Sequence, residues 1–186
     1  MKLLTVALLV IVAAMVVKTY LLSFRFQSPQ DYADTGPQFV LNKHLSGEIL
    51  SEGIIFGPNG KMANSFVAKM VGEWDGDTGT LSEEFTYSNG TTQSRKWYLT
   101  LGPDNTFTAT ADDLVGEAQG TISGSTVQLH YQIVLPESAG GHVLKATDWM
   151  YLTADGAIMN KSEMRKFGLK VAELVATMRP VQGTTR

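Results

Sequence analysis

Tight turns at short and regular intervals are the feature that most constrains the fold of this chain. Asn89-Gly90, Ser123-Gly124 and Asp155-Gly156 are pairs that readily adopt the positive backbone φ angles of two-residue hairpin loops. Pro58-Asn59-Gly60 and Pro103-Asp104-Asn105 mark two further turns. Short apolar segments lie between these turns, and such spacing is typical of antiparallel sandwiches and barrels.

These segments predict about ten strands in an antiparallel meander. The predicted strands are Glu48–Phe56, Met62–Val71, Thr78–Tyr87, Ser94–Leu101, Phe107–Asp113, Glu117–Ile122, Thr126–Leu135, Val143–Leu152, Ala157–Arg165 and Lys170–Met178. Closure into a barrel is favoured over an open sheet, because closure removes exposed strand edges. The predicted fold class is therefore all-β, with a meander that closes into a lipocalin-like barrel.

Alternation of side chains supports strands that bury one face. Leu129, Tyr131 and Ile133 alternate with the polar His130 and Gln132, and this period of two predicts one buried and one wet face. The last segment, 170–178, matches both a helical and a strand pattern. We favour a closing strand there.

The N-terminal stretch predicts a membrane anchor. Leu3–Val17 contains no charge, and Lys18 interrupts the apolar run before Phe24. Spanning a bilayer takes ~20 apolar residues, which Met1–Phe24 supplies if the Lys18 ammonium reaches the head groups. The alternative is a cleaved signal peptide, with Val12 and Ala14 before the cleavage site. We favour the uncleaved, single-pass helix.

The predicted organisation is an anchor over 1–26, a water-exposed linker over 27–38, a barrel over 39–180 and a tail over 181–186. Between residues 27 and 160, six basic residues face sixteen acidic ones, and this acidic balance argues against a nucleic-acid partner. From Lys161 onward the balance reverses to six basic against two acidic residues, which suits anionic head groups or an ordinary solvated face. The chain has no Cys, so disulfides and thiolate chemistry are excluded.

Six residues are predicted to bind a ligand inside the barrel. They are Arg95, Trp97, Asp112, Tyr131, Asp148 and Trp149. Arg95 shares a predicted strand face with Trp97, and its guanidinium is suited to gripping a carboxylate or phosphate head group. The competing interpretations are a cross-strand pair between Glu84 and Arg95, and a structural role for the Asp148-Trp149 pair.

A segment in the C-terminal third carries a family resemblance. Asp148, Trp149, Met150 and Tyr151 precede Asn160, Lys161, Ser162, Met164, Lys166, Phe167 and Gly168. Upstream stand Glu84, Phe85, Tyr87, Arg95, Trp97, Ala111, Asp112, Gly116, Ala118 and Gly120. Together they resemble a bacterial family known as domain of unknown function 3833, from about Phe39 to about Arg179.

This resemblance implies a location rather than a chemistry. Many members of the family are lipoproteins, but this chain has no cysteine to acylate, so a helix would replace the lipid. The resemblance implies export, with the barrel on the periplasmic side of the inner membrane. It also implies enzymes of fatty-acyl modification as partners.

Three functions are open at this point. The first is a membrane-tethered accessory or carrier that binds a lipid, an acyl chain or another apolar small molecule. The second is a lipid-modifying enzyme whose lumen holds Glu84, Arg95, Asp112, His130 and Asp148. The third is a structural envelope protein with a packed, ligand-free barrel. No residue pattern indicates a metal site or a cofactor.

Overall fold

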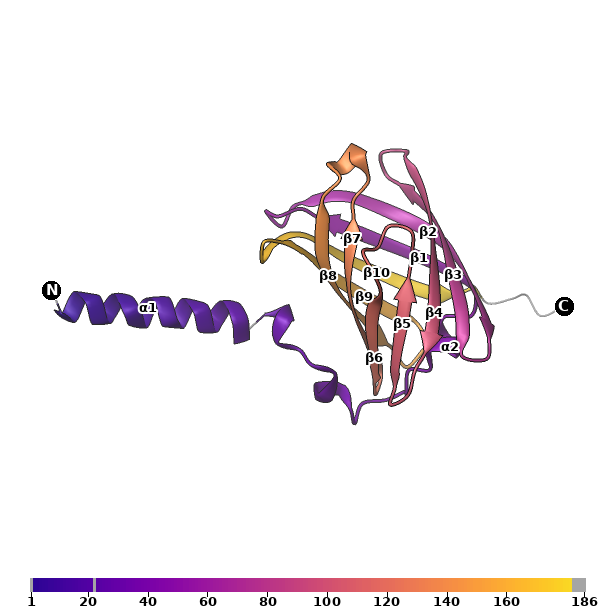
Figure 1. The fold of residues 1–186 in the computed structure, drawn as a ribbon, viewed down its shortest axis with the longest axis horizontal. Coiled ribbons are helices and arrows are strands. Elements are labelled where there is room, and N and C mark those ends of the chain that lie inside the picture. Colours follow the sequence, from indigo (N-terminus) through magenta and orange to yellow (C-terminus); the bar gives the residue numbers. More distant parts are fainter. Residues whose placement is uncertain (1, 22, 182–186) are drawn as a thin grey trace.

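Ten strands form one closed antiparallel barrel in the computed structural model, which describes residues 2–21 and 23–181 (Figure 1). Each strand pairs with its neighbour in sequence, and β1 closes the barrel on β10. The strands are β1 Gly47–Phe56, β2 Met62–Asp75, β3 Thr78–Tyr87, β4 Thr92–Leu101, β5 Thr106–Thr110, β6 Ala118–Ser123, β7 Thr126–Val134, β8 Val143–Leu152, β9 Ile158–Lys166 and β10 Leu169–Pro180. The predicted all-β barrel is confirmed, and the ambiguous last segment is the strand β10.

The helical elements are short apart from the first. They are α1 Lys2–Leu21, η1 Phe24–Phe26, η2 Pro29–Tyr32, α2 Leu41–His44 and η3 Glu137–Ala139, where η denotes a 3-10 helix. Residues 182–186 of the predicted tail lie outside the described residues.

The predicted transmembrane helix requires correction. The apolar segment does form α1, but no helix of the described residues is both long and apolar enough to cross a membrane.

The segment between α1 and the barrel touches the barrel wall, although about half of its side chains are exposed. The Tyr32 ring lies 5.3 Å from the Trp149 ring, centroid to centroid. The Tyr151 hydroxyl donates to Gln27 Oε1 at 2.7 Å. Thr35 Oγ1 lies 2.9 Å from Ser125 Oγ, at the β6–β7 turn. These contacts fix the segment on the outer face of β7 and β8.

A plug of apolar side chains closes one end of the barrel. Phe39, Leu41 and Leu45, in and around α2, are each at most 3% exposed. Gly72 allows this approach, because a Cβ atom there would lie 1.9 Å from the Leu45 carbonyl oxygen. Trp74 Nε1 donates to the same oxygen at 2.9 Å. Apolar side chains therefore close the interior at this end. The charged side chains of the interior lie toward the other end.

Candidate functional site

A cavity of about 130 Å³ lies inside the barrel, next to the α2 plug. Most of its lining is apolar. The apolar side chains are Leu41, Leu45, Phe66, Met70, Leu81, Phe85, Trp97, Leu99, Phe107, Ala109, Leu129, Ile133, Met150, Met164, Leu174, Ala176 and Met178. Polar groups from β3, β4, β7, β8 and β9 join them, and four of these carry the electrostatics of the site: Glu83, Arg95, Tyr131 and Asp148.

An ion pair fixes Arg95. Arg95 Nε donates to Asp113 Oδ1 at 3.0 Å, and Nη2 donates to Oδ2 at 2.6 Å, so the guanidinium is held bidentately. Its carbon Cζ lies 4.7 Å from the centre of the Trp97 ring. The two charged side chains are 14% and 26% exposed, which places the pair at the boundary between the cavity and solvent.

Glu83 is the most perturbed acid of the cavity. It lies opposite Arg95 in the β3–β4 register and is 6% exposed. Trp97 Nε1 donates to its Oε2 at 3.2 Å. Burial raises the pKa of Glu83 to about 7, against the opposing effect of Arg95. Near neutral pH this carboxyl is thus divided between its acid and its anion.

Asp148 carries an oxygen without a partner. Tyr131 donates its hydroxyl to Asp148 Oδ2 at 3.0 Å, whereas Oδ1 is buried and has no hydrogen-bond partner among the described residues. Burial raises the pKa of Asp148 against the hydrogen-bonding effects of the Ser162 and Tyr131 side chains, and it raises the pKa of Tyr131 more strongly. Ser162 lies opposite Asp148 in the β8–β9 register, so a ligand donor at Oδ1 would share this carboxyl with the Ser162 hydroxyl.

Carboxyl groups outnumber cations around the cavity. Three carboxyl groups, Glu83, Asp113 and Asp148, lie near one guanidinium, and Asp113 already engages one edge of it through two nitrogens. A ligand carboxylate would compete with Asp113 and face two further acids. A ligand hydroxyl or amine would instead find Asp148 Oδ1 open.

Four of the six predicted ligand-binding residues line the cavity: Arg95, Trp97, Tyr131 and Asp148. Asp112 does not, because its side chain is exposed and its neighbour Asp113 makes the inward contact. Both residues lie in the turn that follows β5, and this turn directs Asp113 to Arg95, so the prediction missed by one position.

Trp149 is buried outside the cavity rather than in it. It is 0% exposed, but it lies on the outer face of β8, where Tyr32 and Tyr151 cover its ring. Asp148 and Trp149 therefore face opposite sides of the barrel wall. The sequence predicted Trp149 as a ligand contact, because no pattern in it indicates that residues 27–32 fold back over the indole.

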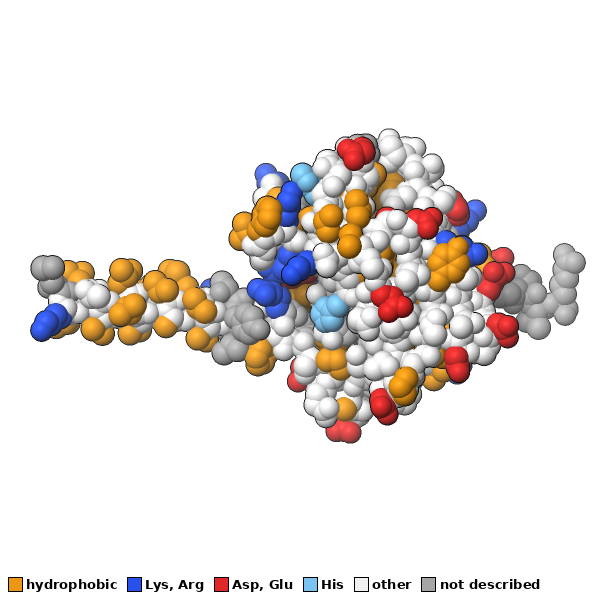
Figure 2. All heavy atoms as spheres, in the orientation of Figure 1, with side chains coloured by type: hydrophobic (Ala, Val, Ile, Leu, Met, Phe, Trp, Pro, Cys, Tyr) orange, Lys and Arg blue, Asp and Glu red, His pale blue; other side chains and the backbone are white. Residues whose placement is uncertain are grey.

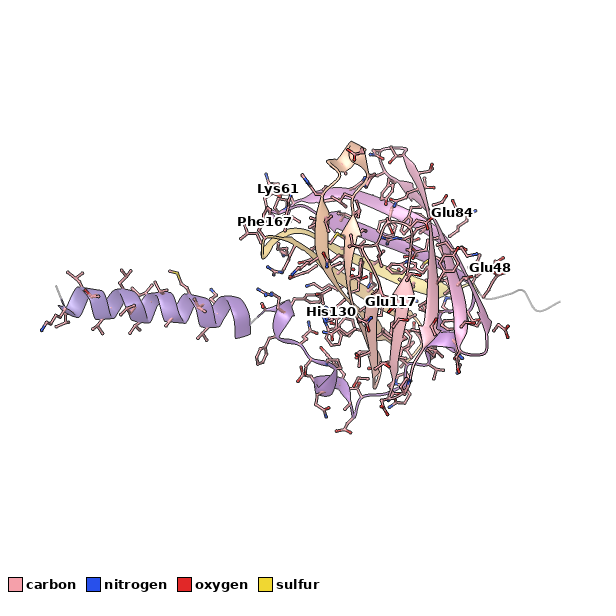
Figure 3. All side chains as sticks on the ribbon, in the orientation of Figure 1. Glu48, Lys61, Glu84, Glu117, His130 and Phe167 are labelled. Atoms are coloured by element: carbon pink, nitrogen blue, oxygen red, sulfur yellow. The ribbon has the colours of Figure 1, made fainter. Side chains whose placement is uncertain are left out.

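The predicted enzymatic cluster does not assemble. Glu84 and His130 lie on the outer face (Figure 3), where Glu84 accepts from Ser94 and His130 contacts Thr147. Arg95 and Asp148 do meet in the cavity, joined by Glu83 and Asp113, which the prediction did not select. Among the described residues no group of three His, Asp or Glu side chains is arranged to hold a metal ion.

Comparisons with known proteins extend these findings. A family model described as "Protein of unknown function (DUF3833)" matches residues 18–180, and no curated protein matches the chain. The S-type phycobiliprotein lyase CPES from Guillardia theta is structurally similar, with a TM-score of 0.57 and 9% identity, over 77% of this chain and 92% of that one. Rv2717c from M. tuberculosis has a TM-score of 0.56 and 15% identity, over 80% and 100%. At these identities the likeness shows the fold alone.

Proposed function

The chain belongs to the DUF3833 family of proteins of unknown function, as the sequence predicted, and from the geometry of its own barrel we propose that it binds one small apolar molecule that carries a hydrogen-bond donor at one end. The observation that carries this proposal is the apolar cavity in which Asp148 Oδ1 is a buried acceptor without a partner. The protein acts as a carrier or accessory for that molecule.

The cavity volume sets the size of the ligand. Apolar cavities of about 150 Å³ accept a benzene-sized molecule, whereas pockets for drug-sized ligands measure ~300–1,000 Å³. A cavity of about 130 Å³ fits one ring or a short branched group. A full-length acyl chain is larger than this cavity. If the ligand is a lipid, only a chain end or a small isoprenoid-sized unit of it fits inside.

The charges of the site set the polarity of the ligand. Asp148 offers an acceptor, and Asp113 offsets the charge of the Arg95 guanidinium while occupying two of its five N–H donors. The expected ligand therefore ends in an alcohol or an amine. The carboxylate or phosphate head group that the sequence predicted opposite Arg95 is disfavoured. Buried acceptors discriminate strongly against ligands that leave them unpaired.

Binding of matched ring compounds tests this proposal. Cyclohexanol, cyclohexylamine and cyclohexanecarboxylate share one ring and differ in the end group. The indole N–H signals of Trp74, Trp97 and Trp149 report the site by nuclear magnetic resonance, because of these three only Trp97 lines the cavity. We expect saturable shifts of the Trp97 signal with the alcohol and the amine, and binding of the carboxylate weaker by about tenfold or more.

Two variants make the result decisive. Ala176→Leu fills the cavity and is expected to abolish the shifts, whereas Ala63→Leu, on an exposed position of β2, leaves them unchanged. Strongest binding by the carboxylate would refute the assigned polarity. Absence of saturable binding by all three probes would refute the carrier function and leave the structural barrel.

One observation favours catalysis as a second candidate. Glu83 is a buried carboxyl with a pKa of about 7 that faces an apolar cavity, and such a group is suited to general acid–base chemistry. Turnover of a bound probe by the wild type that Glu83→Gln abolishes without weakening binding would identify an enzyme.

We also propose that α1 holds the barrel at a membrane, on the periplasmic side of the inner membrane. The support is the exposure of its apolar side chains, from 89% at Leu3 to 50% at Val17, without a covering element among the described residues. Deletion of residues 1–24 is expected to release the barrel from membranes. A deleted chain that still sediments with membranes after a high-salt wash would refute attachment through α1.

A further inference from the structure

The hairpin tip between β9 and β10 exposes large apolar side chains to water. Phe167 lies at this tip (Figure 3). It is 93% exposed, and Leu169 is 72% exposed. Phe167 has a φ of +51° and Gly168 a φ of +81°, as in a two-residue turn that usually takes Asn-Gly. A bulky side chain is rare in this conformation, and here the fold places it away from every core residue.

A basic groove of about 910 Å³ lies beside this tip. Its walls come from η1, β7, β8 and β9, and its cations are Arg25, Lys145, Arg165 and Lys166. Arg165 is bound by Glu163 through two nitrogens, at 3.0 and 2.6 Å. Lys145 is exposed and forms no ion pair with the described residues. The Lys145 ammonium thus adds positive charge to the groove that no carboxylate of the described residues neutralises.

The rest of the molecule differs in charge and in polarity. On the face shown in Figure 2, several basic side chains gather where α1 meets the barrel, and acidic side chains are spread over the rest of the face. The end of α1 joins η1, which lines the same groove as Phe167. Exposed apolar groups and unneutralised cations therefore share one side of the barrel.

We propose that this side, formed by the β9–β10 tip and the basic groove, docks on the surface of an anionic lipid bilayer. Phe167 and Leu169 enter the interfacial layer, where aromatic rings are favoured, while Lys145 and Lys166 face lipid phosphates. The Lys166 ammonium lies 5.6 Å from the Phe167 ring centre, so its stem follows the inserted ring and its charge stays with the head groups. This contact is a property of the barrel, additional to α1 and independent of any ligand in the cavity.

The absence of cysteine allows a direct test in the full chain. An environment-sensitive fluorophore is attached to Leu169→Cys at the tip, or to Tyr98→Cys on β4 as the control. Tyr98 is a suitable control, because it is 53% exposed and also has a lysine near its ring. The Lys96 ammonium lies 5.8 Å from the Tyr98 ring, and the Lys166 ammonium lies 5.6 Å from the Phe167 ring. We expect a blue shift of the label at position 169, and none at position 98, on vesicles of 70% phosphatidylcholine and 30% phosphatidylglycerol.

The charge requirement is tested in the same assay. Lys145→Gln combined with Lys166→Gln is expected to weaken the response at position 169 roughly 30-fold, since two cations leave the anionic surface. Lys69→Gln combined with Lys96→Gln removes two exposed lysines elsewhere and is expected to change it less than about threefold.

The possible outcomes separate this proposal from attachment through α1. A chain that sediments with the vesicles but shows no shift at position 169, or equal shifts at both positions, refutes docking of the tip and leaves α1 as the contact. Equal shifts on pure phosphatidylcholine refute the role of the basic groove. A shift that a protein fraction produces and vesicles do not would assign the face to a protein partner instead.

Discussion

At one end of the barrel Phe39, Leu41 and Leu45 fill the interior with apolar side chains, whereas toward the other end Glu83 and Arg95 bring charge into it. The same strands build both ends. The apolar end gains stability from burial and tolerates no gap, because cores are packed as densely as crystals. The cavity reaches from Leu41 and Leu45 of the plug to the polar end, where Asp148 Oδ1 has no hydrogen-bond partner among the described residues.

The largest effect on the free energy of unfolding is expected when the same Phe→Ala substitution is made at a buried and at an exposed site. Phe107, near the closed end, is 1% exposed, and Phe167, at the outer tip, is 93% exposed. Phe107→Ala is expected to lower the free energy of unfolding by about 3–5 kcal/mol, since it removes a buried ring and enlarges the cavity that Phe107 lines. Phe167→Ala should change it by less than ~0.5 kcal/mol. Urea unfolding monitored by circular dichroism measures both.

A contrary result for this pair would have a specific meaning. A small loss in Phe107→Ala would show that the closed end repacks. Neighbouring side chains would then fill the space beside Gly120 that the Phe107 ring occupies in the wild type. The two ends would then not differ in rigidity, and the cavity would not mark the polar end as special.

The second prediction concerns pH. The pKa of Glu83 is about 7 in the folded state, above the ordinary value of 4.5, so the folded chain binds this proton more tightly than the unfolded chain. Its contribution to stability is full below about pH 4.5 and is lost as the pH rises to about 7. A shift of this size corresponds to about 3 kcal/mol of unfolding free energy between these limits. The raised pKa of Asp148 acts in the same direction.

Glu83→Gln isolates this effect. The variant keeps the shape and an acceptor for Trp97 Nε1 but does not titrate, so its free energy of unfolding should fall less between pH 4.5 and pH 8 than that of the wild type. Glu84→Gln, on the exposed face, is the control and should retain the wild-type slope. Parallel pH profiles of wild type and Glu83→Gln would show that the cavity hydrates Glu83 well enough to keep its pKa ordinary.

The sequence predicted the barrel because turns and alternation are local signals. All ten predicted strands are present, since each is bounded by turn residues and many of them bury alternate side chains. Leu81, Glu83 and Phe85 alternate along β3 in the same way, and all three line the cavity. Glu84 was nonetheless selected as the partner of Arg95, and a shift of one residue moves a side chain to the opposite face.

The remaining features of the site depend on distant segments. Asp113 reaches Arg95 because the loop that follows β5 is pinned to β7, where the Val134 N–H donates to the Asp113 carbonyl at 2.7 Å. Trp149 is outside the cavity but buried because Tyr32 covers it. Contacts between residues so far apart in the chain leave no periodic pattern, so neither was visible in the sequence.

The smallest effect is expected at the Arg95–Asp113 pair, at the boundary of the polar end. Asp113→Asn removes one charge of a bidentate pair whose members are 14% and 26% exposed. The expected loss is about 1–3 kcal/mol, because Arg95 is left partly buried without its counter-ion, while partial exposure to water limits the penalty. Asp112→Asn, on the exposed neighbour, is the matched control and should stay within ~0.5 kcal/mol.

A double-mutant cycle decides what this loss means. If the pair acts as one unit, Arg95→Met combined with Asp113→Asn should be less destabilised than the sum of the two single variants, because neither charge is then left alone. Strict additivity would show that the 2.6 Å contact contributes nothing beyond its separate parts. In the coupled case the double variant also loses the cation of the cavity, so Glu83 should resist ionisation further and the fall in stability should extend above pH 7. The polar end would then be a single electrostatic unit, in contrast to the closed end, whose side chains contribute through packing.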